Sequence, residues 1–187
     1  LNSLSLKLSI FEEIGESADI INLSTQILQN FPNNERALYS RALAYEKEGN
    51  ILSMSKDFDE MIKLNKYNSL ALNAYGYSNA LHKLHLDKSE KLIRKALDIQ
   101  PGQAAILDSL AWVLYLKGSY KDAAKYSSLT YSKDQDPEIV EHHYLILLKN
   151  GNSNEAKYIL NQSIKNNPNN EKLLKLLDSS ENAAIKL

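Results

Sequence analysis

The sequence of 187 residues contains no cysteine. No disulfide can form, so folding requires neither a reducing nor an oxidising compartment. Neither positive nor negative charge is in large excess, because the formal net charge is −1. A nucleic-acid binder carries a basic patch or stripe. We therefore expect no nucleic-acid partner.

Long apolar runs are absent as well. No stretch of the sequence approaches the roughly 20 apolar residues that a membrane-spanning helix needs. The chain begins at Leu1, without a methionine, a signal peptide or a cysteine for lipidation. We therefore expect no membrane span in these residues, and we interpret them as a fragment of a longer protein.

Glycine and proline are few, with six and four residues, but their spacing is regular. Most of them recur with a period of about 34 residues, which is typical of repeated helical hairpins. The periodic residues are Gly15, Gly49, Gly118, Gly151, Pro32, Pro101 and Pro168. Glycine tolerates the left-handed conformation in which a helix ends, and proline cannot continue a helix. Each period therefore predicts a helix, a tight turn, a second helix and a stop.

Small residues occur where the two helices of a hairpin would pack closely. They are Ala42, Gly76 and Ala111 at the eighth place of a period, and Ala123 and Ala156 at the twentieth. Between them apolar residues recur every three or four places, as in amphipathic helices. Polar residues three places before an acid predict capped starts of second helices at Asp87, Ser119 and Asn152. No segment reads as a strand, so the predicted fold class is all-α.

This register resembles the tetratricopeptide repeat (TPR). The resemblance implies one domain, residues 1–187, built as a right-handed α-solenoid of about five repeats with a C-terminal capping helix. The repeats are residues 1–34, 35–68, 69–103, 104–136 and 137–170, and the capping helix is residues 171–187. Lys66 and Gln135 depart from the pattern at the proline place, and Ile20 departs from it at a small-residue place.

Two runs in the later repeats support a narrower resemblance. Residues 73–77 read Asn-Ala-Tyr-Gly-Tyr, and residues 105–115 read Ala-Ile-Leu-Asp-Ser-Leu-Ala-Trp-Val-Leu-Tyr. These runs are similar to the C-terminal repeats of bacterial outer-membrane TPR lipoproteins, some of which are adaptors for periplasmic carboxy-terminal processing proteases. The resemblance covers residues 69–170. It implies a location in the bacterial periplasm, with the tether to the outer membrane in a segment outside these residues.

Residues that suit catalysis or metal binding are scarce. His82 and His85 fall in a turn, where we expect them to be solvated, and His142 and His143 fall on a groove place and a packing place, so their rings should diverge. The sequence has no glycine-rich phosphate loop, zinc-binding helix motif or nucleophile elbow. We therefore expect no enzyme, no cofactor and no metal site.

Function is expected in the concave groove that the first helices of stacked repeats line. The predicted groove residues occupy the fifth, ninth and twelfth places of these helices: Tyr39, Leu43, Asn73, Tyr77, Asp108, Trp112, Tyr115, Glu141 and Leu145. Aromatic side chains give a large contact area at low entropic cost, and asparagine can bond a peptide backbone. The sequence therefore predicts a protein or peptide partner, with Tyr77, Trp112 and Tyr115 as anchors. The alternative for Trp112 is a packing role between neighbouring helices.

A second function class stays open beside the peptide-binding adaptor. The chain can also be a self-associating scaffold, a homo-oligomer that uses its outer faces or the ends of the solenoid. Four leucines in the capping helix are more apolar than a solvent-facing cap requires: Leu173, Leu174, Leu176 and Leu177. They can cover the last repeat and still leave a surface for a second copy.

Overall fold

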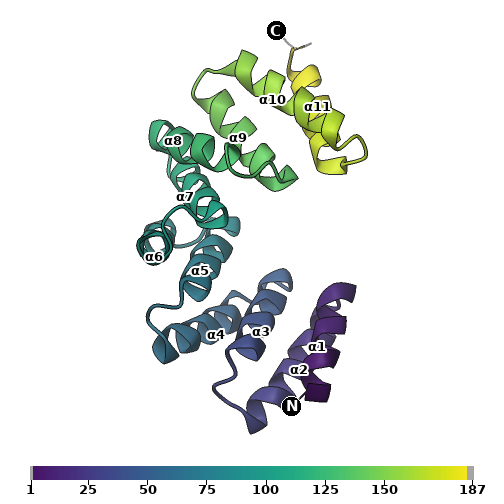
Figure 1. Cartoon of the computed structure of the whole chain (residues 1–187), viewed down its shortest axis with the longest axis vertical. Helices are drawn as coiled ribbons and strands as arrows, with labels where there is room; N and C mark the ends of the chain where they lie inside the picture. Colours follow the sequence, from purple (N-terminus) through teal and green to yellow (C-terminus); the bar gives the residue numbers. More distant parts are fainter. Residues whose placement is uncertain (1, 185–187) are drawn as a thin grey trace. The chain divides into compact units, whose positions relative to one another are not determined.

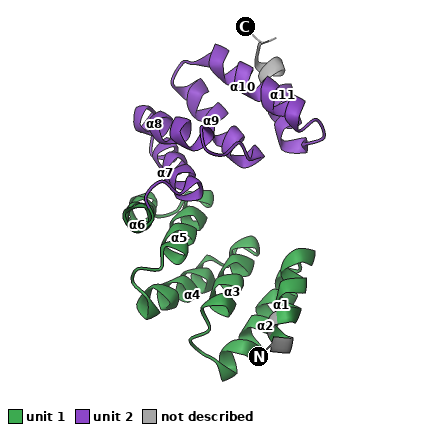
Figure 2. Ribbon diagram, viewed as in Figure 1, with its two compact units in different colours: residues 1–100 green, residues 101–187 purple. Residues whose placement is uncertain are grey.

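The computed structural model describes residues 2–184 of the chain, with the side chains of residues 4 and 6–179. These residues form eleven α-helices and no strand, as the periodicity predicts (Figure 1). None of the helices in this described part combines the length and the apolar character that crossing a membrane requires. Contacts divide the chain into two compact units, residues 1–100 (unit 1) and residues 101–187 (unit 2), shown in Figure 2. The continuity of all repeats in one domain stays a prediction.

Unit 1 consists of three helical hairpins. Each hairpin packs on the next, because α2 contacts α3 and α4 contacts α5. The helices are α1 (Asn2–Ile14), α2 (Ser17–Asn30), α3 (Glu35–Lys47), α4 (Ile51–Leu64), α5 (Ser69–Leu81) and α6 (Leu86–Ile99).

The turns within the hairpins confirm the role predicted for glycine in two repeats and show a different solution in the third. Gly15 and Gly49 have φ of +79° and +72°, the left-handed conformation that ends α1 and α3. The third turn contains no glycine, and Lys83 and His85 take positive φ there instead. His85 precedes α6, which begins at Leu86, so the predicted cap at Asp87 is wrong.

Unit 2 contains two hairpins and a final helix. The helices are α7 (Ala104–Leu116), α8 (Tyr120–Tyr131), α9 (Pro137–Lys149), α10 (Ser153–Asn166) and α11 (Glu171–Ala184). The last helix packs on α9 and α10 and buries Leu173 completely, which is the arrangement expected of a capping helix. Residues 185–187 of the predicted capping helix lie outside the described residues.

Asparagine and aspartate cap the first helices of repeats, a signal that the sequence reading missed. Asn34 and Asn68 accept hydrogen bonds from the first-turn amides of α3 and α5, and Asp136 does the same for α9. Ser119 and Asn152 lie where the starts of second helices were predicted, but neither side chain caps a backbone amide. Their predicted places are therefore confirmed and the predicted cap bonds are wrong.

Close packing within hairpins depends on the small residues that the sequence singles out. The alanines at these places, Ala42, Ala111, Ala123 and Ala156, are fully buried. At Gly76, a Cβ atom would lie 2.6 Å from Ile93 Cγ1 and 2.9 Å from the Ser89 carbonyl oxygen. A larger residue at such a place would force two helices apart.

One buried ion pair joins the two helices of the second hairpin of unit 1. The Arg41 guanidinium donates two hydrogen bonds to the Asp57 carboxylate, at 2.8 and 2.7 Å. Hydrogen bonding to Asp57 raises the pKa of Arg41 despite its partial burial. The pair therefore ties α3 to α4.

Candidate functional site

The predicted groove residues are divided between the two units. Tyr39 and Leu43 lie on α3 and Asn73 and Tyr77 on α5, all in unit 1. In unit 2, α7 carries Asp108, Trp112 and Tyr115, and α9 carries Glu141 and Leu145. One continuous row across both units stays a prediction, so the local geometry is built separately in each unit.

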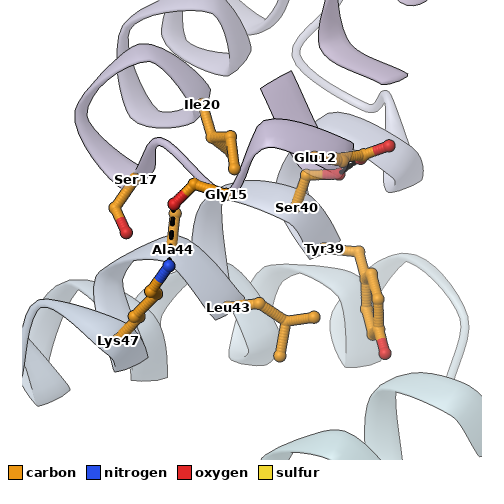
Figure 3. A pocket seen from close by; sticks show the side chains of 9 residues that line it. All are labelled: Glu12, Gly15, Ser17, Ile20, Tyr39, Ser40, Leu43, Ala44 and Lys47. Carbon is orange, nitrogen blue, oxygen red and sulfur yellow. Dashed lines mark hydrogen bonds between the residues drawn. The ribbon is translucent and has the colours of Figure 1, made fainter. Parts of the chain in front are cut away.

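In unit 1, a pocket lies among α1, α2 and α3. It has a volume of about 440 Å³ and contains two of the predicted groove residues (Figure 3). Its lining residues are Glu12, Gly15, Ser17, Ile20, Tyr39, Ser40, Leu43, Ala44 and Lys47. In Figure 3, Ile20 lies above the pocket, and Tyr39 and Leu43 lie below it. We call this cavity the α1–α3 pocket.

The charged groups around the α1–α3 pocket already have partners. Glu12 accepts hydrogen bonds from Arg36 at 2.8 Å and from the Ser40 hydroxyl. At the other end, Lys47 Nζ donates to the Gly15 carbonyl oxygen at 2.7 Å, so it holds the C-terminal end of α1. Both carboxylate and ammonium are therefore engaged in tying α1 to α3. The surface left for a ligand is mainly that of the apolar lining residues.

Tyr39 is the one aromatic side chain among the described lining residues of the α1–α3 pocket. Its ring packs edge-on against Phe58, with the centroids 6.2 Å apart. Burial raises the pKa of Tyr39, so its hydroxyl stays protonated at neutral pH. The hydrogen bonds among the described residues include none to this hydroxyl.

The neighbouring helix α5 is connected to α3 through a histidine that the sequence reading placed in solvent. His82 Nε2 lies 2.6 Å from Glu46 Oε1, and both side chains are half-buried. The expectation that His82 is solvated is therefore wrong, whereas His85 is exposed. Asn73 and Tyr77 on the groove face of α5 are half-buried. The Asn73 Oδ1 atom is covered and has no partner among the described residues.

In unit 2, the aromatic groove residues form a stack between α7 and α9. The Trp112 ring stacks on Tyr115 at 4.9 Å and on His142 of α9 at 4.1 Å. His142 is 4% exposed, and its Nδ1 lies 2.7 Å from Asp108 Oδ2. Both stacking partners of the indole belong to unit 2, and Trp112 and Tyr115 are themselves half-buried. We call Trp112, Tyr115, His142 and Asp108 the α7–α9 stack.

The acidic groove residues of unit 2 also have partners. Asp108 is 7% exposed and bonds His142, and its other oxygen is buried without a partner among the described residues. Glu141 is half-buried and lies 3.7 Å from Lys172 of α11. Leu145 packs on the core cluster of α9 and α10. These contacts connect successive helices. Little of the Asp108 side chain is exposed, whereas the Glu141 side chain is 29% exposed.

The two adjacent histidines of α9 diverge as predicted. His142 turns to α7, whereas His143 turns to α8, where its Nδ1 lies 2.9 Å from the Ser127 hydroxyl. His143 is 2% exposed and stacks on Tyr131 at 5.0 Å. Burial lowers the pKa of His143, and Glu155 partly opposes this effect. In the described part of the chain, no three His, Cys, Asp or Glu side chains gather as a metal site.

Sequence reasoning missed the residues that decide whether each place is open or filled. Ser40 and His142 both occupy the sixth place of their helices, and they face the first helix of the preceding repeat through the hydrogen bonds described above. Lys47 was missed because its partner is a backbone carbonyl. The sequence contained one signal for these contacts. An acidic and a basic residue, such as Asp108 and His142, fall in the first helices of successive repeats.

A curated relative agrees with this architecture. TPR repeat-containing protein PA4667 of Pseudomonas aeruginosa is 33% identical over 115 residues, which are 62% of this chain and 20% of that protein. The matching residues thus span about a fifth of the length of this relative. No protein-family model matches the chain.

Solved structures share this architecture, among them a TPR protein. A thermophilic TPR protein from Thermus thermophilus has a TM-score of 0.81 at 17% identity, over 95% of this chain and 96% of its own. The APC/C hetero-tetramer Cut9–Hcn1 contains a chain with a TM-score of 0.79 at 20% identity, over 91% of this chain and 34% of its own. The chain therefore has the tetratricopeptide-repeat fold, as the glycine and proline spacing predicts.

Proposed function

We propose that this chain is a non-catalytic scaffold that binds a protein or peptide, and that the α1–α3 pocket receives an apolar side chain of the partner. The observation that carries the proposal is the coincidence of a pocket with two residues, Tyr39 and Leu43, at groove places. TPR folds in general serve protein interaction, and the structural neighbour Cut9–Hcn1 is itself a complex of two proteins.

The chemistry of the pocket favours an uncharged aliphatic or aromatic side chain. Glu12 and Lys47 are engaged by the protein itself, so a charged ligand group would be desolvated without a new ion pair. Ile20, Leu43 and Ala44 offer apolar contact instead. The Tyr39 hydroxyl can donate a hydrogen bond to a backbone carbonyl next to the bound side chain. An extended peptide with one large apolar residue satisfies both requirements.

A peptide selection tests the proposal. Peptides selected from a random phage-displayed library on the purified chain are made with a fluorophore, and their affinity is measured by anisotropy. We expect them to share a large uncharged residue, and Leu43→Asp to weaken binding at least tenfold. Tyr39→Phe should weaken it less, because the ring stays. The matched control is Leu52→Asp on α4, where the leucine is 69% exposed outside the pocket.

The outcome that contradicts the proposal is equally direct. Selected peptides that bind Leu43→Asp and the parent chain equally well would show that the α1–α3 pocket is not the binding site. Circular dichroism of each variant checks that the helices are intact. Equal loss of binding in Leu43→Asp and Leu52→Asp would also count against the pocket.

We further propose a role as an adaptor in the bacterial periplasm. The support is the resemblance of residues 69–170 to outer-membrane TPR lipoproteins, some of which bring substrates to processing proteases. Fractionation of the native cells tests the location. Recovery of the protein in the cytoplasmic fraction alone would refute it.

A further inference from the structure

A row of large apolar side chains lies exposed along one side of α1. Leu6, Ile10 and Ile14 are 65%, 47% and 62% exposed. Their spacing of four places puts them on one side of the helix. Leu8, in contrast, is 1% exposed and belongs to the core of unit 1. Single exposed leucines are ordinary, but a contiguous row marks an interface. We call these three residues the α1 stripe.

The repeat register shows what covers this side of a helix elsewhere in the chain. Ser40 and Ala44 of α3 stand one repeat after Leu6 and Ile10, and they are only 5% and 4% exposed. Their cover comes from the preceding hairpin. The Ser40 hydroxyl bonds Glu12 of α1, and α2 packs along α3.

The tenth place of the period, that of Ile10, is buried in the other hairpins whose predecessor lies in the same unit. Ser78 of α5 is 3% exposed and Ile146 of α9 is 0% exposed. The sixth place, that of Leu6, is buried at His142, which contacts Asp108 of α7, and half-buried at Ala74. The fourteenth place, that of Ile14, is exposed at Glu48. Leu6 and Ile10 therefore stand at places that the preceding hairpin contacts elsewhere, and they have no cover among the described residues.

We infer that the α1 stripe is a repeat-to-repeat interface, and that its occupant is an amphipathic helix of a further hairpin of the same protein, N-terminal to α1. This interface continues the series made by α2 on α3 and α4 on α5. The stripe itself carries no charge, so its occupant presents aliphatic residues at three- and four-place spacing. The inference is independent of the α1–α3 pocket, because none of the three stripe residues lines that pocket.

Hydrogen exchange on two lengths of the protein tests the inference. The full-length natural protein is compared with the 187-residue chain. We expect the amides of α1 to exchange at least tenfold more slowly in the natural chain. Ile10→Ser should remove this slowing there and leave exchange in the 187-residue chain unchanged. The matched control is Leu52→Ser, which replaces another exposed leucine and should change neither.

Three outcomes would overturn the inference. The first is equal exchange of α1 in both lengths, and the second is an equal effect of Ile10→Ser in both. The third is a concentration-dependent dimer, seen by light scattering for both lengths and abolished by Ile10→Ser, because it assigns the stripe to a second copy. Helical content measured by circular dichroism verifies that each variant folds.

Discussion

Equivalent places of the repeat hold small or polar side chains in unit 1 and ring side chains in unit 2. Between α1 and α3, the ninth and twelfth places of the first helix and the sixth place of the second hold Ser9, Glu12 and Ser40. Between α7 and α9, the same places hold Trp112, Tyr115 and His142. In unit 1, Glu12 and Ser40 line a pocket of about 440 Å³, whereas Ser9 does not. In unit 2, three stacked rings occupy these places, and a pocket of about 520 Å³ lies at Gly118, Tyr120 and Lys149.

This comparison separates what the repeat determines from what individual side chains determine. The backbone register brings the same three places together in each unit. Whether they bind a ligand depends on the volume of the side chains there. In unit 1 the polar groups bond one another at the edge of a cavity. In unit 2 the rings stack on one another, and their role in recognition stays a prediction.

The largest effect is expected from removing the centre of the α7–α9 stack. Trp112→Ala should lower the free energy of unfolding by about 3 kcal/mol, the lower end of the range for a large ring, because the half-buried indole loses its stacking on Tyr115 and His142. Denaturant titration measures this loss, and hydrogen exchange should place it in α7 and α9. Leu43→Ala, in the α1–α3 pocket, is the control and should cost much less, since Leu43 is 36% exposed.

The opposite result would restore the anchor role that the sequence predicts for Trp112. That result is an unchanged free energy of unfolding for Trp112→Ala together with a loss of partner affinity of roughly thirtyfold, about 2 kcal/mol. A packing role of Trp112 requires the reverse, a large loss of unfolding free energy with a smaller loss of partner affinity.

The fold was predictable because it depends on residues with local conformational roles. Gly15 and Gly49 end helices through their own backbone conformation, and Ala111 is buried because the period places it between two helices. Such properties depend on spacing along the chain. The pattern therefore predicted helical hairpins correctly, including the turn places.

The candidate site was predictable only in part, because side-chain accessibility depends on residues of the next repeat. Trp112 stands at a groove place, as expected, but His142, 30 residues later in the sequence, covers one face of its ring. His82 likewise looked solvated until Glu46 from another helix approached it. Sequence periodicity places a residue on a face of its helix and does not reveal which neighbour occupies that face.

An intermediate effect is expected from a difference between the starts of α3 in unit 1 and α7 in unit 2. In unit 1, Asn34 caps α3 by accepting a hydrogen bond from Ala37 N, whereas Gln103 precedes α7 in unit 2 without a side-chain cap. Gln103→Asn should therefore raise the free energy of unfolding by about 0.5–1 kcal/mol. Asn34→Ala is the matched loss of a cap and should lower it by about 1 kcal/mol.

Denaturant titration at neutral pH measures both changes. If Asn34→Ala lowers stability and Gln103→Asn does not raise it, the start of α7 does not admit a side-chain cap. Equal and opposite changes in the free energy of unfolding would show that the starts of α3 and α7 differ in stability only through the capping residue.

The smallest effect at neutral pH is expected from His143. This buried histidine of unit 2 has no counterpart in unit 1. His143 is buried against α8, and burial lowers its pKa below the ordinary value of about 6.5. As the pH falls below about 6.5, the unfolded chain binds a proton that the folded chain does not, so the free energy of unfolding decreases. Above that pH both states are neutral at this residue, and no effect is expected.

His143→Gln should therefore flatten the pH dependence of stability on the acidic side, compared with the parent chain. His85→Gln, which changes an exposed histidine, is the control and should leave the dependence unchanged. Denaturant titrations between pH 5 and 8, the range in which histidine titrates, measure the slopes. Identical slopes for His143→Gln and the parent chain would show that His143 takes up its proton equally in both states.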